Sequence, residues 1–390
     1  MSGVDLSRGA LTGLRVVDLS RVLAGPLCAQ MLADHGAEVI KVEPPQGDET
    51  RHLGPPFDAN GQAAYFGAVN RGKRAITLDL SQAEARATLA ELVDGADVLV
   101  ENFLPGTLER WGLGYEQTLR ARHPRLIYCS ISGFGAEGPL GGLPGYDAVL
   151  QAMCGVMSIN GTPESGPTRV GIPIVDYVTG YNALSGILLA LNVRHQTGRG
   201  QRVDVALFDS ALALLIPHAA NWMVSGKTPG RLGSDHPNIT PYGKFQASDG
   251  ELFLGIVNDG QFRRFCHQLD RPALAGDPRF ATNPARLEHR AELRAEIERL
   301  LAGFKVEKIC GALMKNGVPA GAVNTVPQAF AQPHVAARKM LIEQDGHRAP
   351  GIPVKLGDTP GVPGRPPPKV NQHAKEIRRE ILAELKGEKR

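Results

Sequence analysis

The chain of 390 residues has few of the features that would place a protein in a special class. Its five cysteines are scattered and form no Cys-x-x-Cys pair, which argues against a disulfide framework or a zinc site and favours a reducing cytoplasm. Lysine and arginine number 43 against 40 acidic residues, so a formal net charge of +3 offers no basic face for a nucleic acid. The 11 histidines stand singly, without the spacing of metal ligands, and we expect no metal site.

Long apolar segments are also missing. The first residues lack the basic and apolar regions of a signal peptide. No uninterrupted apolar run reaches the roughly 18 to 20 residues that span a bilayer, and the nearest one, 203–220, is interrupted by Asp204 and Asp209. We therefore expect a cytoplasmic protein with neither a membrane nor a nucleic acid as its partner.

The composition that remains is that of an ordinary globular protein, with 42% hydrophobic and 21% charged residues. A single hydrophobic core has usually stopped growing at this length, so we expect two domains. In the first half of the chain, β-type runs alternate with helix-like segments, which predicts a parallel sheet covered by helices. The predicted strands are 14–19, 39–42, 75–80, 97–100, 126–131 and 203–207, and the predicted helices are 26–36, 82–93, 181–191 and a long apolar one after 207.

The pattern changes near residue 226. A loop rich in Gly and Pro over 227–241 precedes a predicted hairpin, and a helix is expected over 286–301. The proline-rich stretch 358–369 predicts an extended connector, and the last residues predict a charged, exposed helix. The expected parts are a large domain over 1–225, a small α+β domain over 226–325, and a return linker with a C-terminal segment over 326–390 that packs on the large domain.

One carboxylate stands out in the first domain. Asp176 lies between an apolar run and the apolar segment 181–191, where an ionised group costs several kcal/mol unless it is paired or used. A helix N-cap or a buried ion pair would explain it without any function. A catalytic carboxylate would explain it as well, and the residues alone leave both readings open.

Two turns after predicted strands combine residues suited to an anionic ligand. The segment from Arg21 to Pro26 joins the first strand to the first helix, where backbone amides and the helix dipole favour an anion. Asn102, Phe103 and Arg110 follow another strand and suit a ligand with a flat base and phosphates. The alternatives are an ordinary strand–helix turn and a capped turn with a surface arginine.

Two other segments also allow more than one interpretation. GFGAEG at 133–138 matches the G-x-G-x-x-G dinucleotide pattern, but a segment rich in Pro and Gly follows it where the pattern needs a helix. We therefore expect a glycine-rich loop and no nicotinamide or flavin site. The cationic loop 70–74 is either a solvated face or part of a site for a small anion.

Six segments carry a resemblance to a known family: LSRVLAGP at 19–26, AEVIKVE at 37–43, NRGKR at 70–74, ENFLPG at 101–106, GYDA at 145–148 and the stretch 173–180 with Asp176. Together they resemble the class III coenzyme A transferases, which include formyl-CoA:oxalate and carnitine CoA-transferases. The resemblance extends from about residue 14 to the C-terminal tail. Through 55–57 and 239–242 the chain is most similar to members that act on dicarboxylates such as succinate and glutarate.

The resemblance implies a fold, substrates and site residues. The expected fold is α/β, with a Rossmann-like large domain that binds CoA and a small α+β domain, in a homodimer whose chains interlock. The active site would lie between the large domain of one subunit and the small domain of the other. CoA and acyl-CoA would be substrates, with no permanently bound cofactor. The family nucleophile falls on Asp176, and the coenzyme contacts fall on Leu23, Ala24, Leu78, Asn102, Phe103 and Arg110.

Two comparisons within the superfamily narrow the reaction. The formyl-CoA enzyme carries a glutamine where this chain has Leu23, and a run of glycines where this chain has 233–236. Both differences speak against formate or oxalate as a substrate. Racemases of similar fold use a histidine that falls on Tyr146, and a tyrosine there favours transfer over epimerisation.

We therefore expect a CoA-transferase that moves CoA from an acyl-CoA such as succinyl-CoA to a free carboxylic acid, in particular a dicarboxylic acid, through an aspartyl anhydride and an aspartyl thioester. Arg21, Arg71 and Arg74 are candidates to bind a second carboxylate, and Tyr146 is a further candidate substrate-binding residue. Backbone amides near Gly233 would stabilise the oxyanions. The alternatives are a CoA-ester racemase or isomerase of the same fold and a non-catalytic acyl-CoA-binding protein.

Overall fold

The computed structural model describes residues 9–386. By their contacts these residues divide into two compact units. The first unit reaches Gly155, resumes over Val170–Leu215 and returns from Pro333 onward. The second unit combines Val156–Arg169 with Ile216–Gln332.

A six-stranded parallel sheet forms the centre of the first unit. Its strands are β1 (Arg15–Asp18), β2 (Glu38–Glu43), β3 (Lys73–Thr77), β4 (Val98–Glu101), β5 (Ile127–Ser132) and β6 (Arg202–Ala206). The strand order, β3-β2-β1-β4-β5-β6, is that of a Rossmann-like sheet, so the predicted α/β fold is confirmed. The order reverses between β1 and β4, and sheets of this kind bind ligands beside that point, at the carboxyl ends of the strands.

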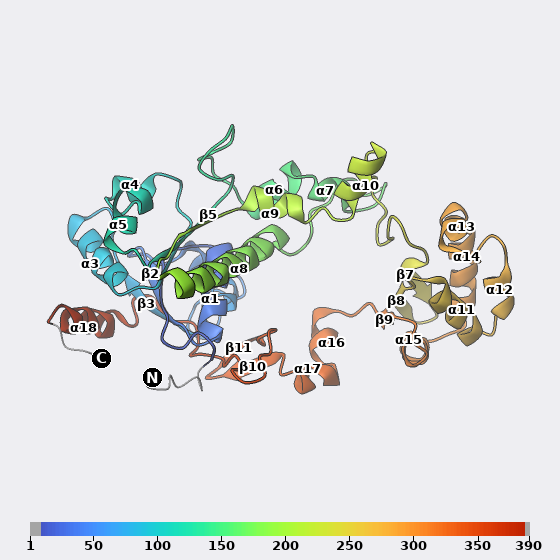
Figure 1. The fold of residues 1–390 in the computed structure, drawn as a ribbon. Helices are drawn as coiled ribbons and strands as arrows, with labels where there is room; N and C mark the ends of the chain where they lie inside the picture. The colour runs from blue at the N-terminus through green and yellow to red at the C-terminus, as the bar shows by residue number, and fades with distance from the viewer. Residues whose placement is uncertain (1–8, 387–390) are drawn as a thin grey trace. The chain divides into compact units, whose positions relative to one another are not determined.

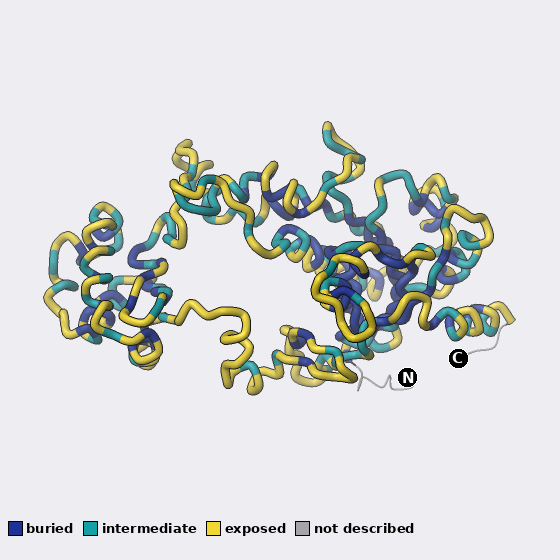
Figure 2. Tube along the Cα trace, turned by 180° about the vertical axis from the view of Figure 1, so that it is seen from behind, coloured by how far each residue is buried: buried dark blue, intermediate teal, exposed yellow. Residues whose placement is uncertain are grey.

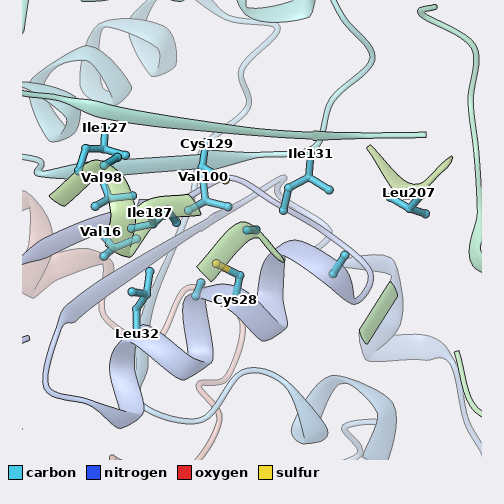
Figure 3. Packing of buried hydrophobic residues seen from close by; sticks show 14 of the residues in the cluster. Val16, Cys28, Leu32, Val98, Val100, Ile127, Cys129, Ile131, Ile187 and Leu207 are labelled. Carbon is cyan, nitrogen blue, oxygen red and sulfur yellow. The ribbon is translucent and has the colours of Figure 1, made fainter. Parts of the chain in front are cut away.

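Two long helices cover one face of this sheet and lie side by side (Figure 1). They are α1 (Ala24–Asp34) and α8 (Ile174–Thr197). Figure 3 shows Leu32 of α1 and Ile187 of α8 pointing toward Val16 of β1, within one buried apolar cluster. The helices approach closely where α8 has a glycine, because a Cβ at Gly180 would lie 2.8 Å from the carbonyl oxygen of Ala24.

The opposite face of the sheet has a helix layer of its own. It includes α3 (Ala83–Asp94) and the C-terminal helix α18 (Ala374–Leu385). Leu89 and Leu92 of α3 and Ile377 and Ile381 of α18 are buried in the same cluster as Ile76 of β3. The prediction of an exposed C-terminal helix is therefore wrong for its isoleucine face.

Short elements complete the first unit. They are η2 (Glu49–His52), α2 (Ala64–Ala68), α4 (Thr107–Arg110), η3 (Tyr115–Leu119), α5 (Arg120–Arg122), α6 (Asp147–Met153), α9 (Leu207–Ala213), α17 (Pro333–Ala337), β10 (Leu341–Gln344) and β11 (His347–Pro350). The burial pattern in Figure 2 follows this layout, since buried residues concentrate along the central strands while the segment around α17 is exposed. Between β11 and α18 the chain runs without helix or strand, as expected for the proline-rich stretch.

The second unit is an antiparallel sheet packed against helices. Its strands β7 (Tyr242–Ala247), β8 (Gly250–Gly255) and β9 (Ala320–Ala322) pair in that order, and β7 and β8 form the predicted hairpin. Its helices are α7 (Val156–Ile159), α10 (His218–Ser225), α11 (Asp259–Gln268), α12 (Pro272–Gly276), α13 (Asn283–Glu288), α14 (Arg290–Leu301), α15 (Val306–Lys315) and α16 (Val326–Phe330). Phe245, Leu254, Phe265 and Leu313 are among the residues of its own buried core.

Two predicted helices are wrong because each is broken. The expected long apolar helix after residue 207 is divided into α9 and α10, with Pro217 directly before α10. A proline there has no N–H to donate and clashes with the preceding turn, so a continuous helix is excluded. The expected helix over 286–301 is likewise divided into α13 and α14, which meet at His289.

The predicted domain boundaries and the two units divide the chain differently. Residues 156–169 and 216–225 were expected in the large domain, but they group with the second unit. Hydrogen bonds explain the first difference, since the N–H of Gly233 donates to the carbonyl of Gly161 (2.9 Å) and the Arg231 guanidinium donates to the carbonyl of Thr162 (3.2 Å). The domain boundaries expected from the sequence stay a prediction.

Candidate active site

A cavity of about 360 Å³ opens at the carboxyl ends of β1, β4 and β5. This is the edge of the sheet at which the strand order reverses, where a Rossmann-like fold is expected to bind its ligand. The structure therefore brings together residues that are far apart in the sequence. The predicted site residues that line the cavity are Arg21, Leu23, Ala24, Asn102, Phe103, Tyr146 and Asp176.

Asp176 lies in the first turn of α8, three residues after the N-cap residue Pro173. It is half-buried, and within residues 9–386 no hydrogen bond or ion pair reaches its carboxylate oxygens. The two structural explanations of this residue, a helix N-cap and a buried ion pair, therefore do not apply. Burial raises the pKa of Asp176 to about 7, and the charge of Asp147 adds to the rise.

Asp147 explains why the helix start does not stabilise the charge of Asp176. The first N–H groups of a helix normally favour a nearby anion. Here the N–H groups of Val175 (2.8 Å) and of Asp176 itself (3.3 Å) donate to the Asp147 carboxylate instead. The segment GYDA at 145–148 gave no sign of a role for Asp147, because the helix N–H groups that it accepts begin 28 positions later in the chain.

Tyr65 of α2 is a second residue that the sequence reasoning missed. Burial, followed by the charges of Asp176 and Asp147, raises the pKa of Tyr65 to about 12. The phenol therefore lies within electrostatic reach of the candidate nucleophile. Nothing in the sequence marks it, since it lies on a helix of only five residues, more than a hundred positions before Asp176.

The loops beside the cavity hold one another in place. The side-chain oxygen of Asn102 accepts from the backbone N–H of Arg21 (2.9 Å), and its Nδ2 donates to the carbonyl of Arg21 (2.8 Å). The Arg21 guanidinium lies 5.2 Å from the centre of the Phe103 ring, close enough for a cation–π contact. Asn102 thus joins the two loops, while Arg21 and Phe103 form a wall that combines charge and an aromatic ring.

Leu78 and Arg110 lie farther along the same edge. A second cavity of about 140 Å³ shares Arg21 and Phe103 with the first and is also lined by Leu78 and Trp111. Arg110, in α4, is exposed, and its guanidinium donates to the hydroxyl of Thr107 (2.9 Å). Both positions suit contacts to a ligand longer than the main cavity.

Arg71 and Arg74, two candidates for a substrate carboxylate, are placed elsewhere. Arg71 is 5% exposed, and its Nε donates to Asp34 (2.8 Å). Arg74 is 6% exposed and pairs with Glu376 (2.8 Å) and Glu380 (2.7 Å) of α18. The structure does not bring these two arginines to the cavity, and their charges are paired with carboxylates of the fold. Of the three arginine candidates, Arg21 lines the cavity.

Two buried lysines, one of them in the cationic loop 70–74, stabilise the backbone next to the cavity. Lys73 is fully buried, and its ammonium group donates to Asp18 (2.9 Å) and to the carbonyl of Pro26 (2.8 Å). The buried Lys41 donates to the carbonyl of Ser20 (2.8 Å). Both lysines thus hold the turn between β1 and α1, which carries Leu23 and Ala24.

The glycine-rich segment 133–145 contributes backbone to the cavity, with Gly133 and Gly145 among its lining residues. A Cβ at Gly133 would lie 2.8 Å from the backbone nitrogen of Gly145, so only glycine allows the two ends of this loop to approach so closely. The next helix, α6, begins at Asp147, which agrees with a loop rather than a dinucleotide fingerprint. Gly233 belongs to the second unit, where its backbone conformation (φ 62°) is left-handed.

Comparison with known proteins identifies the family. The model of CoA-transferase family III matches residues 11–374. The chain is 44% identical over 396 residues to succinate–glutarate CoA-transferase of Agrobacterium fabrum (99% of this chain, 98% of that protein), and 41% identical over 379 residues to acetyl-CoA:oxalate CoA-transferase of Acetobacter aceti (96% and 97%). The crystal structure of a CAIB/BAIF family protein from Brucella suis superposes with a TM-score of 0.86 at 45% identity (96% and 100%). The chain therefore belongs to CoA-transferase family III.

Proposed function

We propose that this transferase moves CoA from an acyl-CoA thioester, such as succinyl-CoA, to a free dicarboxylic acid, with Asp176 as the group that is transiently acylated. The observation that carries the proposal is the Asp176 carboxylate itself. It opens into the cavity at the switch point of the sheet, and in the described chain it has no cation or donor to hold it. A carboxylate so placed is available to attack a bound thioester.

The first half of the reaction transfers the donor acyl group and then CoA. A carboxylate oxygen of Asp176 attacks the thioester carbonyl, the C–S bond breaks, and CoA leaves as a thiolate while a mixed anhydride forms. The thiolate then attacks the carbonyl carbon of Asp176. The anhydride C–O bond breaks, the donor acid leaves as a carboxylate, and Asp176 becomes a CoA thioester.

The second half repeats these steps with the acceptor acid. The acceptor carboxylate attacks the Asp176 thioester, which gives a new anhydride and free thiolate. Attack of the thiolate on the acceptor carbonyl forms the product thioester and returns Asp176 as a carboxylate. One thioester replaces another, so the atoms balance without ATP or a redox partner, and no permanently bound cofactor is proposed.

The surroundings of Asp176 suit this role. A carboxylate with a pKa of about 7 is a stronger base, and so a stronger nucleophile, than an aspartate in water. Anhydrides hydrolyse readily, so the partial burial of Asp176 also limits the loss of intermediate to water. Below about pH 7 the carboxyl group takes up a proton and can no longer attack.

The coenzyme and the acid would be bound by the loops at the same edge. The Phe103 ring would stack on the flat base of the coenzyme, and the exposed Arg110 would supply a cation for its phosphates. The relatives' names support a dicarboxylate as acceptor, since the succinate–glutarate CoA-transferase names two dicarboxylates. Arg21 is the proposed partner of the second carboxylate, because of the three candidates it lines the cavity.

We further propose a homodimer located in the cytoplasm. The outer face of α8 supports self-association, because Leu188, Leu189 and Val193 are exposed while the inner face of the same helix is packed on the sheet. The location is supported by all five cysteines, which carry free, buried thiols. Sedimentation analysis of the protein and of a Leu189→Glu variant tests the dimer; an unchanged dimer in that variant would exclude this face.

The activity is tested by incubation with succinyl-CoA and a panel of free dicarboxylic acids, with the new thioesters identified by mass. Hydroxylamine added during turnover should convert the acylated Asp176 into a hydroxamate, which peptide mapping locates. A racemase of the same fold would instead incorporate solvent deuterium at the α-carbon without any exchange of CoA. A protein that only binds acyl-CoA would yield neither product.

A further inference from the structure

Helix α6 carries two buried side chains that hold the segment leading into Asp176. Asp147 is 7% exposed and Gln151 is fully buried. The Oδ2 atom of Asp147 accepts the N–H groups at the second and third positions of α8, at 2.8 Å and 3.3 Å. The helix takes this cap from α6 because its own N-cap residue, Pro173, has no side-chain acceptor.

Gln151 extends the attachment upstream. Its Nε2 donates to Oδ1 of Asp147 (2.7 Å) and lies 3.4 Å from the carbonyl oxygen of Ile172. Its Oε1 accepts from the backbone N–H of Val170 (2.8 Å). The pair therefore contacts backbone groups at both ends of the segment 170–176, and every one of these contacts originates from one turn of α6.

The pair also sets the electrostatic environment of the Asp176 carboxylate. Asp147 occupies the N–H groups that would otherwise stabilise an anion at the start of α8, and it adds a like charge next to the Asp176 backbone. Burial is the larger cause of the raised pKa of Asp176, and Asp147 is the second. Other titratable groups around the carboxylate are Tyr65 of α2, Tyr177 of α8, and Tyr146, Arg21 and Glu49 in the cavity.

We infer that Asp147 and Gln151 are positioning residues of the transfer reaction, which fix the backbone that presents Asp176 and keep a negative charge beside its carboxylate. The inference rests on the proposed function. The two side chains of this hydrogen-bonded pair have different tasks. Asp147 supplies the charge and the helix cap, and Gln151 supplies the attachment of the upstream segment.

Asp147→Asn tests the charge, since it keeps the size of the side chain and one acceptor oxygen. Removal of the negative charge should lower the pKa of Asp176, so the acidic limb of kcat/KM should move to lower pH by about one unit. An amide cannot accept from both α8 and Gln151, so kcat on the plateau should also fall by about tenfold, with KM for acyl-CoA changed by less than about twofold.

Gln151→Met tests the attachment without changing the charge. It should lower kcat by a similar factor while the acidic limb stays where it is in the wild type. Asp94→Asn, a carboxylate-to-amide change at the end of α3 that breaks a surface pair with Arg122, is the matched control and should alter neither quantity.

An Asp147→Asn enzyme with the wild-type limb and the wild-type kcat would overturn the inference. If that variant fails to fold, Gln151→Met decides: a lowered kcat with an unmoved limb supports the positioning role, and unchanged kinetics refute it. Failure of the proposed function looks different. The wild-type enzyme would then yield no hydroxamate at Asp176, whereas normal trapping together with indifferent variants would refute only the roles of Asp147 and Gln151.

Discussion

Asp18 and Asp176 are two carboxylates of the same unit with opposite surroundings. Asp18, at the end of β1, is fully buried and accepts from Lys73 (2.9 Å) and from the Ser20 hydroxyl. Burial alone would raise its pKa, but the charges of Lys73 and Lys41 outweigh burial and hold the pKa below its usual range. Asp176 meets no such charge among the described residues, and its pKa rises. A buried carboxylate with partners holds the fold, and one without them is available for chemistry.

The arginines divide in the same way. Arg71 is buried and bonded to Asp34 through both its Nε and its Nη2, so its charge is already used. Arg110 is exposed and bonded to a neutral hydroxyl. The comparison predicts that changes to paired side chains affect stability, whereas changes to the others affect activity.

Asp176→Ala should produce the largest effect on activity. Without the acyl acceptor, transfer between succinyl-CoA and a dicarboxylic acid should fall by roughly a thousandfold or more. Circular dichroism should show an unchanged fold, and calorimetry should show that CoA still binds, since the loops that carry Arg21 and Phe103 are untouched. Substantial residual turnover by this variant would contradict the covalent mechanism.

Lys73→Met should produce the largest effect on stability. It removes the ammonium group paired with the buried Asp18 carboxylate, leaving Lys41 as its remaining cation, and it removes a donor from the Pro26 carbonyl, so the free energy of unfolding should fall by about 3 to 5 kcal/mol. Urea denaturation measures this loss. The matched control is Glu292→Ala, which breaks exposed pairs with Arg279 and His289 and should leave the urea midpoint nearly unchanged, because water screens such pairs. Equal losses in both variants would break the comparison.

These contrasts show which parts of the molecule a sequence can reveal. The strand runs and the alternation of strand and helix were predicted because buried parallel strands are continuous apolar segments. Asp176 stood out because a carboxylate is costly next to apolar residues. The break at Pro217 could also have been predicted, since the residue itself excludes a continuous helix.

The partners of charged side chains could not be predicted. Arg71 meets Asp34 37 positions away, and Arg74 meets Glu376 302 positions away, so neither pairing has a local signal. Asp147 was missed for the same reason, because it caps a helix that begins far along the chain. Residue type therefore indicates where a charge is, and only the packed structure indicates whether it is already paired.

Asp176→Asn should separate stability from activity. The carboxyl pKa is about 7 in the folded state against 3.8 for the reference aspartate, so the folded protein binds the proton more tightly and wild-type stability falls as pH rises between these values. The amide has no such loss. The variant should be inactive yet more stable than the wild type by roughly 1 to 3 kcal/mol above about pH 7, with the gain vanishing near about pH 4. Asp18→Asn should instead lose stability at neutral pH, which thermal unfolding across pH would show.

Arg110→Ala tests the arginine that has no carboxylate partner, and it should give the smallest change in activity of these variants. Among the described residues its guanidinium has a single hydrogen-bond partner, a threonine hydroxyl, so its removal should leave the unfolding midpoint unchanged. If it contacts the coenzyme, KM for acyl-CoA should rise by about three- to tenfold, which corresponds to roughly 1 kcal/mol, while kcat changes little. Arg71→Ala is the matched control. It should lower the unfolding midpoint, because the substitution removes the partner of Asp34 inside the fold, and it should leave KM unchanged, because Arg71 is not among the residues that line the cavity. An Arg110 variant with an unchanged KM would remove that residue from the coenzyme site, and the exposed charge would then be an ordinary surface residue.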